Sequence, residues 1–284
     1  MVDIILPFYN RKNLILRAIQ SVKNQTFQDW FLWLIDDGST DGGLKDLKKE
    51  LPEHVKILTF KENRGVSFAR NQALKQGQRA WVAFLDSDDE WLPEKLEKQI
   101  GYLLKNPDKN FVHCNETWIK NKKILPQKKH HKKQGGRVFI PSTRLCCMSP
   151  SATLMKRSLF KELGLFREDF PVCEDYELWL RVSSRYEVGF LEETLIVKYG
   201  GHEGQLSEQY RAMDYWRVKA LKPFLEDPHL SFEETQQVQK TLIKKCQILL
   251  KGYEKHKNFT HQKEINDLLK QVVDKSLTEL GHRS

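Results

Sequence analysis

Short apolar runs alternate with segments of helical periodicity over the first 104 residues, and this alternation limits the folds that the chain can adopt. The apolar runs, which we interpret as strands, are Val2–Phe8, Trp30–Ile35, Val55–Phe60 and Trp81–Leu85. The helix-like segments are Asn10–Asn24, with Asn10 as its cap, Val66–Gln76 and Pro93–Leu104. Strands that are apolar throughout and separated by helices predict an α/β fold, with a mainly parallel sheet and helices on both faces.

The rest of the chain is expected to contain two further parts. Between residues 111 and 206 the pattern is mixed, with strands at Phe111–Trp118 and Ser151–Met155 and a helix at Glu174–Arg185. From residue 207 onward apolar residues recur only at helical spacing, which predicts three helices and no strands. The chain therefore divides into residues 1–110, 111–206 and 207–284, the last being a C-terminal helical extension.

The net charge of +9 favours an acidic or phosphorylated partner, although a solvated basic surface is an equally good interpretation. Seven lysines lie in the stretch Lys120–Lys133, together with His130 and His131, and we expect an exposed loop there. Because aromatic residues are not interleaved with these lysines, nucleic acid is not an expected partner. Reversible contact with an anionic membrane is one expectation, and a soluble protein with a solvated lysine loop is the other.

The five cysteines include no C-x-x-C pair, which favours reduced thiols in a cytoplasmic protein and no zinc site. Cys146 and Cys147 are interpreted as packing residues, and Trp179 and Leu180 as core residues. No apolar run approaches the ~20 residues that span a bilayer, and the N-terminus does not resemble a signal peptide. The expected location is the cytoplasm, with peripheral attachment at the inner face of the membrane as an extension of that prediction.

Three carboxylates occur within the four residues Asp86-Ser87-Asp88-Asp89, directly after a predicted strand. Such groups repel one another, so a packed core is not expected to hold them together. Ligands of parallel sheets bind beyond the carboxyl ends of the strands, and hard oxygen ligands there suit Mg²⁺ or Mn²⁺ shared with substrate phosphates. An acidic, solvated turn is the alternative.

Other predicted strands also end in polar residues, at Pro7–Asn10, Asp36–Asp37 and Lys61–Arg64. An aspartate at the second of these sites would accept hydrogen bonds from a base or a ribose. The alternative is an Asx turn that leads into Gly38.

Five motifs in the first 90 residues resemble, in order and spacing, those of the family 2 glycosyltransferases. They are Leu6–Arg11, Ser21–Phe27, Ile35–Gly42, Asn63–Asn71 and Phe84–Asp89. The resemblance continues more loosely through Cys173–Arg181 and to His202, and it fades after about Ser207. It implies a GT-A type, Rossmann-like fold and an inverting transfer of a sugar from a nucleoside diphosphate sugar, with Mn²⁺ or Mg²⁺ as cofactor.

The resemblance also assigns roles to individual residues. The nucleotide-sugar pocket would include Pro7, Tyr9, Asn10, Asp37, Arg70, Asp86 and Ser87. Within it, Asp37 would contact the base and Asp86 the ribose. Asp88 and His202 would bind the metal or diphosphate, and Asp175 would be the catalytic base. The alternatives are a loop histidine for His202 and, for Asp175, a first-turn residue favoured by the helix dipole.

These roles agree with the chemistry, because inverting transfer needs a base on the acceptor hydroxyl and positive charge on the departing diphosphate. Residues 1–110 would then bind the donor and residues 111–206 the acceptor. UDP is the first choice of donor nucleotide, ahead of GDP and dTDP. The acceptor would be a glycan or a lipid-linked glycan of the cell surface.

Two other functions stay open. A sugar-phosphate nucleotidyltransferase would carry a basic, glycine-rich loop near the N-terminus, whereas Pro7–Arg11 has no glycine. A non-catalytic relic that binds a nucleotide sugar or a polyanion is the second alternative, and the intact Asp88 and Asp175 argue against it.

Overall fold

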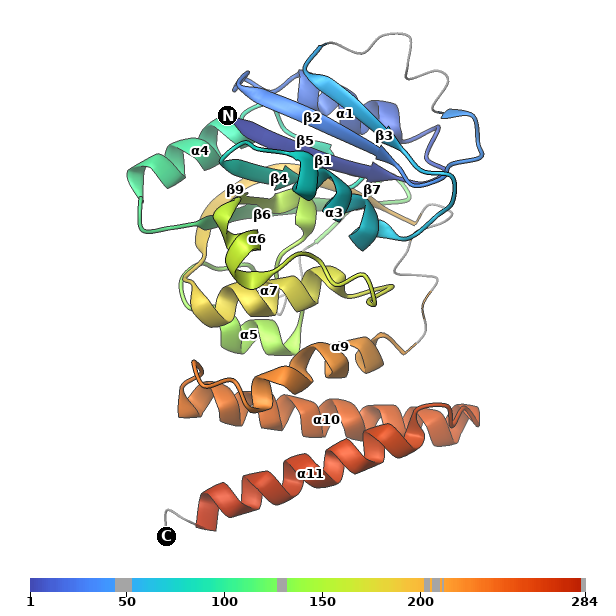
Figure 1. The fold of residues 1–284 in the computed structure, drawn as a ribbon, viewed down its shortest axis with the longest axis vertical. Coiled ribbons are helices and arrows are strands. Elements are labelled where there is room, and N and C mark those ends of the chain that lie inside the picture. The colour runs from blue at the N-terminus through green and yellow to red at the C-terminus, as the bar shows by residue number, and fades with distance from the viewer. Residues whose placement is uncertain (44–52, 127–131, 202–204, 206–209, 211, 282–284) are drawn as a thin grey trace.

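The computed structural model describes residues 1–43, 53–126, 132–201, 205, 210 and 212–281 (Figure 1). Within them, one sheet has the strand order β3-β2-β1-β4-β8-β6-β9-β5, and β7 pairs with β6. The strands are β1 Val2–Phe8, β2 Trp30–Asp36, β3 Val55–Thr59, β4 Trp81–Phe84, β5 Glu90–Trp91, β6 Phe111–Lys120, β7 Lys123–Leu125, β8 Thr153–Lys156 and β9 Gly189–Gly200. The helices are α1 Ile15–Lys23, α3 Val66–Gln76, α4 Lys95–Lys105, α5 Phe139–Arg144, α6 Ser158–Leu163, α7 Glu174–Arg185, α9 Met213–Leu221, α10 Phe232–His256 and α11 Gln262–Gly281. Two short 3₁₀ helices are η2 Pro150–Ala152 and η3 Lys222–Leu225.

The sheet has a parallel half and a mixed half. Strands β3, β2, β1 and β4 are parallel neighbours, and every residue of β1 is buried, including Asp3, whose carboxylate pairs with Arg79 and Arg157. Beyond β4 the pairing changes, because β8 is antiparallel to both β4 and β6, whereas β9 is parallel to β6. The prediction of a parallel sheet therefore holds for the N-terminal half.

Helices cover both faces of the sheet, as predicted. On one face α1 and α4 pack against alternate residues of β1, including Ile4 and Leu6. On the other face α3, α6 and α7 pack against Ile5 and Phe84. Trp179 of α7 belongs to this second core, which confirms that it is a core residue.

The expected cap of the first helix is wrong. Helix α1 begins at Ile15, and Asn10 lies outside it with a left-handed φ of 52°. The side-chain oxygen of Asn10 instead accepts a hydrogen bond from the backbone N–H of Thr40, at 2.8 Å. A contact with a residue thirty positions away has thus displaced the local capping role.

The C-terminal part contains three α-helices and, within residues 212–281, no strand, as predicted. Helices α9, α10 and α11 share a core with α5 and α7, and Figure 1 shows them stacked on the side of α7 that faces away from the sheet. Helix α10 begins with a capping box formed by Ser231 and Glu234. Because α7 contributes residues both to this core and to the core on the sheet, it lies between the sheet and the extension. Among the described residues, no helix is long and apolar enough to cross a membrane.

The lysine-rich stretch differs from the predicted exposed loop. Lys120 and Lys123 are paired residues of the β6–β7 hairpin. Lys133 is 6% exposed, and its ammonium lies 2.9 Å from the carboxylate of Glu116, so a buried ion pair replaces solvent there. Residues Lys128, Lys129, His130 and His131 lie outside the described residues.

Candidate active site

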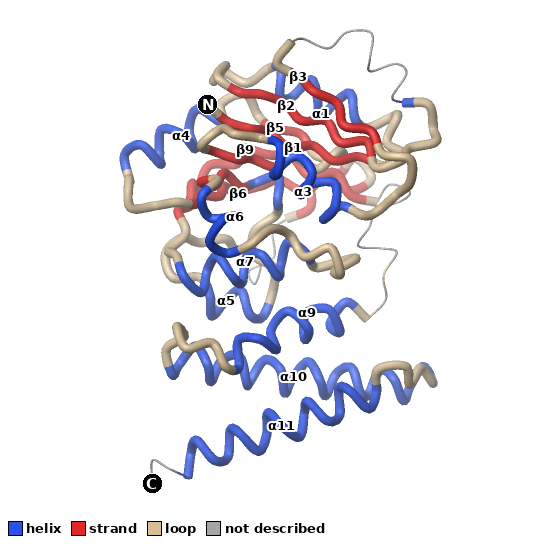
Figure 2. Tube along the Cα trace, in the orientation of Figure 1, coloured by secondary structure: helices blue, strands red, loops and turns tan. Residues whose placement is uncertain are grey.

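The carboxyl ends of β1, β2 and β4 lie along one edge of the sheet, and the loops that leave these strands gather on that side (Figure 2). The register places Phe8 beside Asp36. Pro7, a predicted pocket residue, is buried within β1, whereas Tyr9 is 42% exposed at the edge. Of these two, Tyr9 is the side chain that a ligand at this edge can reach.

The loops after β1 and β2 are fastened to each other. The backbone N–H of Asn10 donates to Ser39 Oγ at 2.9 Å, and the backbone N–H of Thr40 donates back to the Asn10 side chain. The carboxylate of Asp36 accepts from the N–H of Ser39, three residues on, at 2.9 Å, so this side chain spans the turn at Asp37 and Gly38. These contacts give the rim of the site a defined shape.

Asp37 connects this rim to the next loop. Its carboxylate accepts hydrogen bonds from the backbone N–H groups of Arg64 and Gly65, the latter at 2.8 Å. Burial raises the pKa of Asp37, and the two backbone donors oppose that rise. A contact between Asp37 and a nucleotide base stays a prediction.

Gly38 is required by this arrangement. Its φ is 82°, and an added Cβ would lie 2.6 Å from the carbonyl carbon of Glu62. Gly42 has a similar φ of 77° but open space around it. We expect Gly42→Ala to lose roughly 1–2 kcal/mol for the left-handed backbone. Gly38→Ala adds the clash, and we expect a loss of roughly 3 kcal/mol. Urea denaturation of both variants measures the difference, and equal losses would contradict the proposed clash.

The acidic motif after β4 forms a turn that the backbone N–H of Asp89 closes on the carbonyl of Asp86 at 3.0 Å. Ser151 Oγ accepts from the N–H of Asp86 and donates to the Asp89 carboxylate at 2.6 Å. The ammonium of Lys198 lies 2.7 Å from Asp89 and 3.9 Å from Asp86. Burial opposes the charge on Lys198, yet these carboxylates raise its pKa. The prediction that a core would exclude this motif is wrong for Asp89, which is 1% exposed because Lys198 neutralises it.

The other two residues of the motif differ in exposure. Ser87 is buried, whereas Asp88 is partly exposed. The guanidinium of Arg17 donates to the backbone carbonyl of Asp88 at 2.6 Å and stacks on the ring of Tyr199 at 3.6 Å. Among the described residues, no three His, Cys, Asp or Glu side chains converge into a metal site.

Arg70 joins the acidic turn to a distant helix. It is 2% exposed, and its two terminal nitrogens lie 2.8 Å from Asp86 Oδ1 and 2.8 Å from Glu174 Oε1. Burial opposes its charge, but the two carboxylates raise the pKa of Arg70. The side chain predicted to face the nucleotide thus lies between two carboxylates, one from the turn after β4 and one from the start of α7.

Asp175 lies in the first turn of α7, after Cys173 in the left-handed conformation. One carboxylate oxygen accepts from the N–H of Tyr176 at 2.6 Å, and the other accepts from the thiol of Cys146 at 3.6 Å. Burial raises the pKa of Asp175, and Arg70 opposes the rise. A partly buried carboxylate with a raised pKa is suited to proton transfer. The alternative of a dipole-stabilised first-turn residue fits the same position, and the base role stays a prediction.

The sequence analysis did not predict the polar contacts of three residues in this region, although it interpreted one of them, Cys146, as a packing residue. They are Glu174, Lys198 and Cys146, which contact Arg70, Asp89 and Asp175 respectively. Glu174 directly precedes the predicted base, Asp175, within the Cys173–Arg181 motif. That position could have identified Glu174 as a residue of the site. Lys198 and Cys146 belong to no recognised motif. His202, the second predicted metal ligand, lies outside the described residues.

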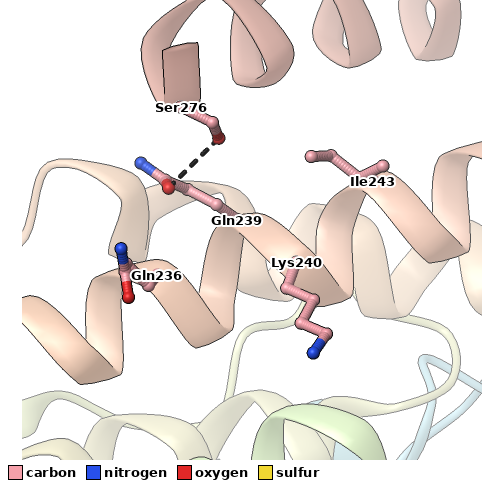
Figure 3. A pocket seen from close by; sticks show the side chains of 5 residues that line it. All are labelled: Gln236, Gln239, Lys240, Ile243 and Ser276. Carbon is pink, nitrogen blue, oxygen red and sulfur yellow. Dashed lines mark hydrogen bonds between the residues drawn. The ribbon is translucent and has the colours of Figure 1, made fainter. Parts of the chain in front are cut away.

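A separate pocket of about 300 Å³ lies in the C-terminal extension (Figure 3). It is lined by Gln236, Gln239, Lys240, Ile243 and Ser276. Ser276 donates to the side-chain oxygen of Gln239 across it, at 3.1 Å. None of the predicted site residues lines this pocket, so it is not the candidate active site.

Comparison with known proteins supports the enzymatic interpretation. The sequence model described as "Glycosyl transferase family 2" matches residues 3–164. The UDP-Glc:alpha-D-GlcNAc-diphosphoundecaprenol beta-1,3-glucosyltransferase WfgD of Escherichia coli is 35% identical over 187 residues, which cover 64% of this chain and 69% of that protein. The putative teichuronic acid biosynthesis glycosyltransferase TuaG of Bacillus subtilis (strain 168) is 39% identical over 106 residues, 37% of this chain and only 42% of that protein.

Solved structures with the same fold have low sequence identity. S. aureus TarS 1–349 in complex with UDP-GlcNAc has a TM-score of 0.69 and 18% identity, with 95% of this chain and 91% of that chain covered. The mannosyltransferase PcManGT from Pyrobaculum calidifontis, in complex with GDP-Man and Mn²⁺, has a TM-score of 0.65 and 17% identity, covering 97% and 86%. The expected GT-A fold is confirmed by this likeness.

Proposed function

The chain belongs to glycosyl transferase family 2 and is a glycosyltransferase; we propose that it transfers a sugar, with inversion, from a nucleoside diphosphate sugar to an acceptor hydroxyl. One observation carries the proposal. Arg70 contacts both Asp86, in the turn after β4, and Glu174 at the start of α7. The proposed donor-binding motif and the proposed base, which is next to Glu174, are therefore adjacent although about ninety positions separate them.

In the proposed reaction the acceptor oxygen bonds to the anomeric carbon while the bond from that carbon to the diphosphate oxygen breaks. Asp175 takes the proton from the acceptor hydroxyl. Tyr9, Asn10, Asp37, Asp86 and Ser87 hold the nucleotide, with Pro7 behind them in β1. Arg70 orients Asp86, and Lys198 fixes the turn that carries Asp88.

The oxygen ligands that the site offers fit a divalent cation. Asp88 is a partly exposed carboxylate at a strand end, and Mg²⁺ is bound in proteins by one or two carboxylates together with substrate phosphates. Mn²⁺ or Mg²⁺ bound by Asp88 would supply positive charge to the departing diphosphate. We keep His202 as a second proposed ligand.

The relatives suggest the substrates. The name of WfgD specifies UDP-Glc and a diphosphoundecaprenol-linked acceptor, and TarS was solved with UDP-GlcNAc. We propose a UDP-sugar as donor, with GDP- and dTDP-sugars as alternatives, and a lipid-linked glycan of cell-surface polysaccharide synthesis as acceptor. The enzyme would act in the cytoplasm, at the inner face of the membrane.

Thermal-shift and hydrolysis measurements with UDP-, GDP-, dTDP- and CMP-sugars, with and without Mn²⁺, test the proposal. A UDP-sugar is expected to raise the melting temperature only when Mn²⁺ is present, because the ion joins the phosphates to Asp88. Pyrophosphate release from a nucleoside triphosphate and a sugar phosphate would instead identify a nucleotidyltransferase. No response to any nucleotide sugar would contradict the proposed function.

A further inference from the structure

The β6–β7 hairpin presents an apolar and basic tip to solvent. Every residue from Asn121 to Pro126 is exposed, and the exposed fraction reaches 71% for Ile124 and 43% for Leu125. Trp118, on the adjoining strand, is 36% exposed. Twelve large apolar side chains are exposed in the described residues. Three of them, Trp118, Ile124 and Leu125, lie within eight positions of one another. Such clustering marks an interaction surface rather than scattered exposure.

Lysines surround these apolar side chains. Lys120, Lys122 and Lys123 occupy the end of β6, the turn and the start of β7. Lys122 and Lys123 are exposed and precede Ile124 in the chain. A tip that combines an aliphatic side chain with flanking cations complements a surface that has anionic head groups over an apolar layer.

The tip of the hairpin is a two-residue turn. Asn121 and Lys122 both have left-handed backbones, with φ values of 52° and 61°, and they join the paired residues Lys120 and Lys123. Two left-handed residues between paired strand ends form a tight hairpin turn, and glycine is the preferred residue at the second position of such a turn. Lys122 therefore holds a charged side chain in a left-handed position at the tip.

The hairpin is also continuous with the candidate active site. Side chains alternate along a strand, so Trp118 and its partner Leu125 share a face with Lys120 and Lys123, whereas Ile124 lies on the opposite face. Ile124 and Leu125 can therefore meet one bilayer only where the tip of the hairpin enters it end-on. Trp118 is in register with Lys198 of β9, whose ammonium lies 5.5 Å from the indole ring. Lys198 in turn contacts Asp89 of the acidic turn, at 2.7 Å. A surface docked on the hairpin therefore lies beside the site.

We propose that the β6–β7 hairpin docks the enzyme on an anionic lipid bilayer, with Ile124 and Leu125 entering the interface and Lys120, Lys122 and Lys123 contacting lipid phosphates. The inference depends on the proposed function for its purpose, the presentation of a lipid-linked acceptor to the site. It does not depend on that function for its test, since lipid binding is measured without substrate.

The test is sedimentation of the full chain with vesicles of phosphatidylcholine alone or mixed with phosphatidylglycerol. The hairpin variant combines Lys122→Gly, Lys123→Gln and Ile124→Ser, and glycine at position 122 relieves the left-handed backbone, so the turn is retained. The matched control combines Lys244→Gln, Ile248→Ser and Lys251→Gln on α10, where the lysines are exposed and Ile248 is 50% exposed. Both variants lose two positive charges and one exposed isoleucine.

The wild type is expected to bind the mixed vesicles at low salt and to release them at high salt. The hairpin variant should bind more weakly by roughly 5-fold for each lysine, with a further loss from the isoleucine. The control should bind as the wild type does. Equal losses in both variants, or binding to neutral vesicles alone, would overturn the proposal.

Single substitution separates a bilayer from a soluble polyanion. Ile124→Ser should weaken vesicle binding, because it removes the aliphatic side chain that enters the bilayer. Binding to a soluble polyanion should not change, because such a polymer has no apolar layer. If Ile124→Ser binds vesicles as the wild type does while Lys122→Gly does not, the hairpin is a polyanion site and the bilayer proposal fails. Nucleotide-sugar thermal shifts of the same variants are expected to match the wild type, which distinguishes this failure from failure of the proposed function.

Discussion

Asp175→Asn is expected to lower turnover by roughly 10²–10⁴-fold, the range that a positioned general base contributes. The amide keeps the shape of the side chain and an oxygen for the N–H of Tyr176, which Asp175 accepts at 2.6 Å. It cannot take a proton from the acceptor. Affinity for the donor should change little, because the proposed nucleotide contacts come from the β1, β2 and β4 loops and not from α7.

The measurement pairs turnover with calorimetry of donor binding. Cys146→Ala is the matched control, since it removes the thiol that lies 3.6 Å from Asp175 and leaves the carboxylate in place. We expect its turnover to stay close to that of the wild type. Loss of donor binding in Asp175→Asn, or an equal loss of turnover in both variants, would show that Asp175 is not the base.

The pH profile gives a second readout for Asp175. Burial raises its pKa, and a base must be ionised, so turnover should fall on acidification at a higher pH than an ordinary carboxyl group would give. Burial also raises the pKa of Glu174 to about 7, so both groups protonate as the pH falls. Residual activity of Asp175→Asn should keep any dependence due to Glu174 and lose the part due to Asp175.

Elements defined by local pattern were predictable from the sequence. Helices α3 and α7 have the bounds that the apolar periodicity predicted, and β1 is buried throughout because its positions are apolar apart from Asp3, which pairs with Arg79 and Arg157. The chain order of the motifs indicated the GT-A fold, which the comparisons confirm. Periodicity and turn residues act over a few positions, so they can be read without knowing the fold.

Contacts between distant residues were not predictable in this way. Arg70 and Glu174 are 104 positions apart, and Asp89 and Lys198 are 109 apart. The sequence analysis placed the motif with Asp89 outside a packed core and Lys133 in an exposed loop, whereas each is buried against an opposite charge, Lys198 and Glu116 respectively. A partner supplied by another strand reverses the cost of burial, and no local pattern announces that partner.

Asp88→Ala and Asp89→Ala are expected to impair different properties, metal-dependent binding and folding stability respectively, although the residues are adjacent. Asp88 is partly exposed at the strand end and is the proposed metal ligand. Its loss should weaken Mn²⁺-dependent donor binding by more than the ~10–100-fold that removal of an outer-shell partner costs at metal sites. Folding stability should change little. Asp89 is 1% exposed and paired with Lys198, and breaking a buried ion pair costs about 3–5 kcal/mol.

Two measurements on both variants separate these roles. Calorimetry of UDP-sugar binding with and without Mn²⁺ reports the metal dependence, and urea denaturation without ligand reports the free energy of unfolding. Asp267→Ala, which removes a half-exposed carboxylate from α11, controls for the loss of one negative charge and should alter neither quantity. If Asp88→Ala keeps the full effect of Mn²⁺, the ion is held elsewhere. Asp89 holds the turn through Lys198 and Ser151, so its replacement should lower the free energy of unfolding. Under conditions in which Asp89→Ala stays folded, its binding of the UDP-sugar should still depend on Mn²⁺.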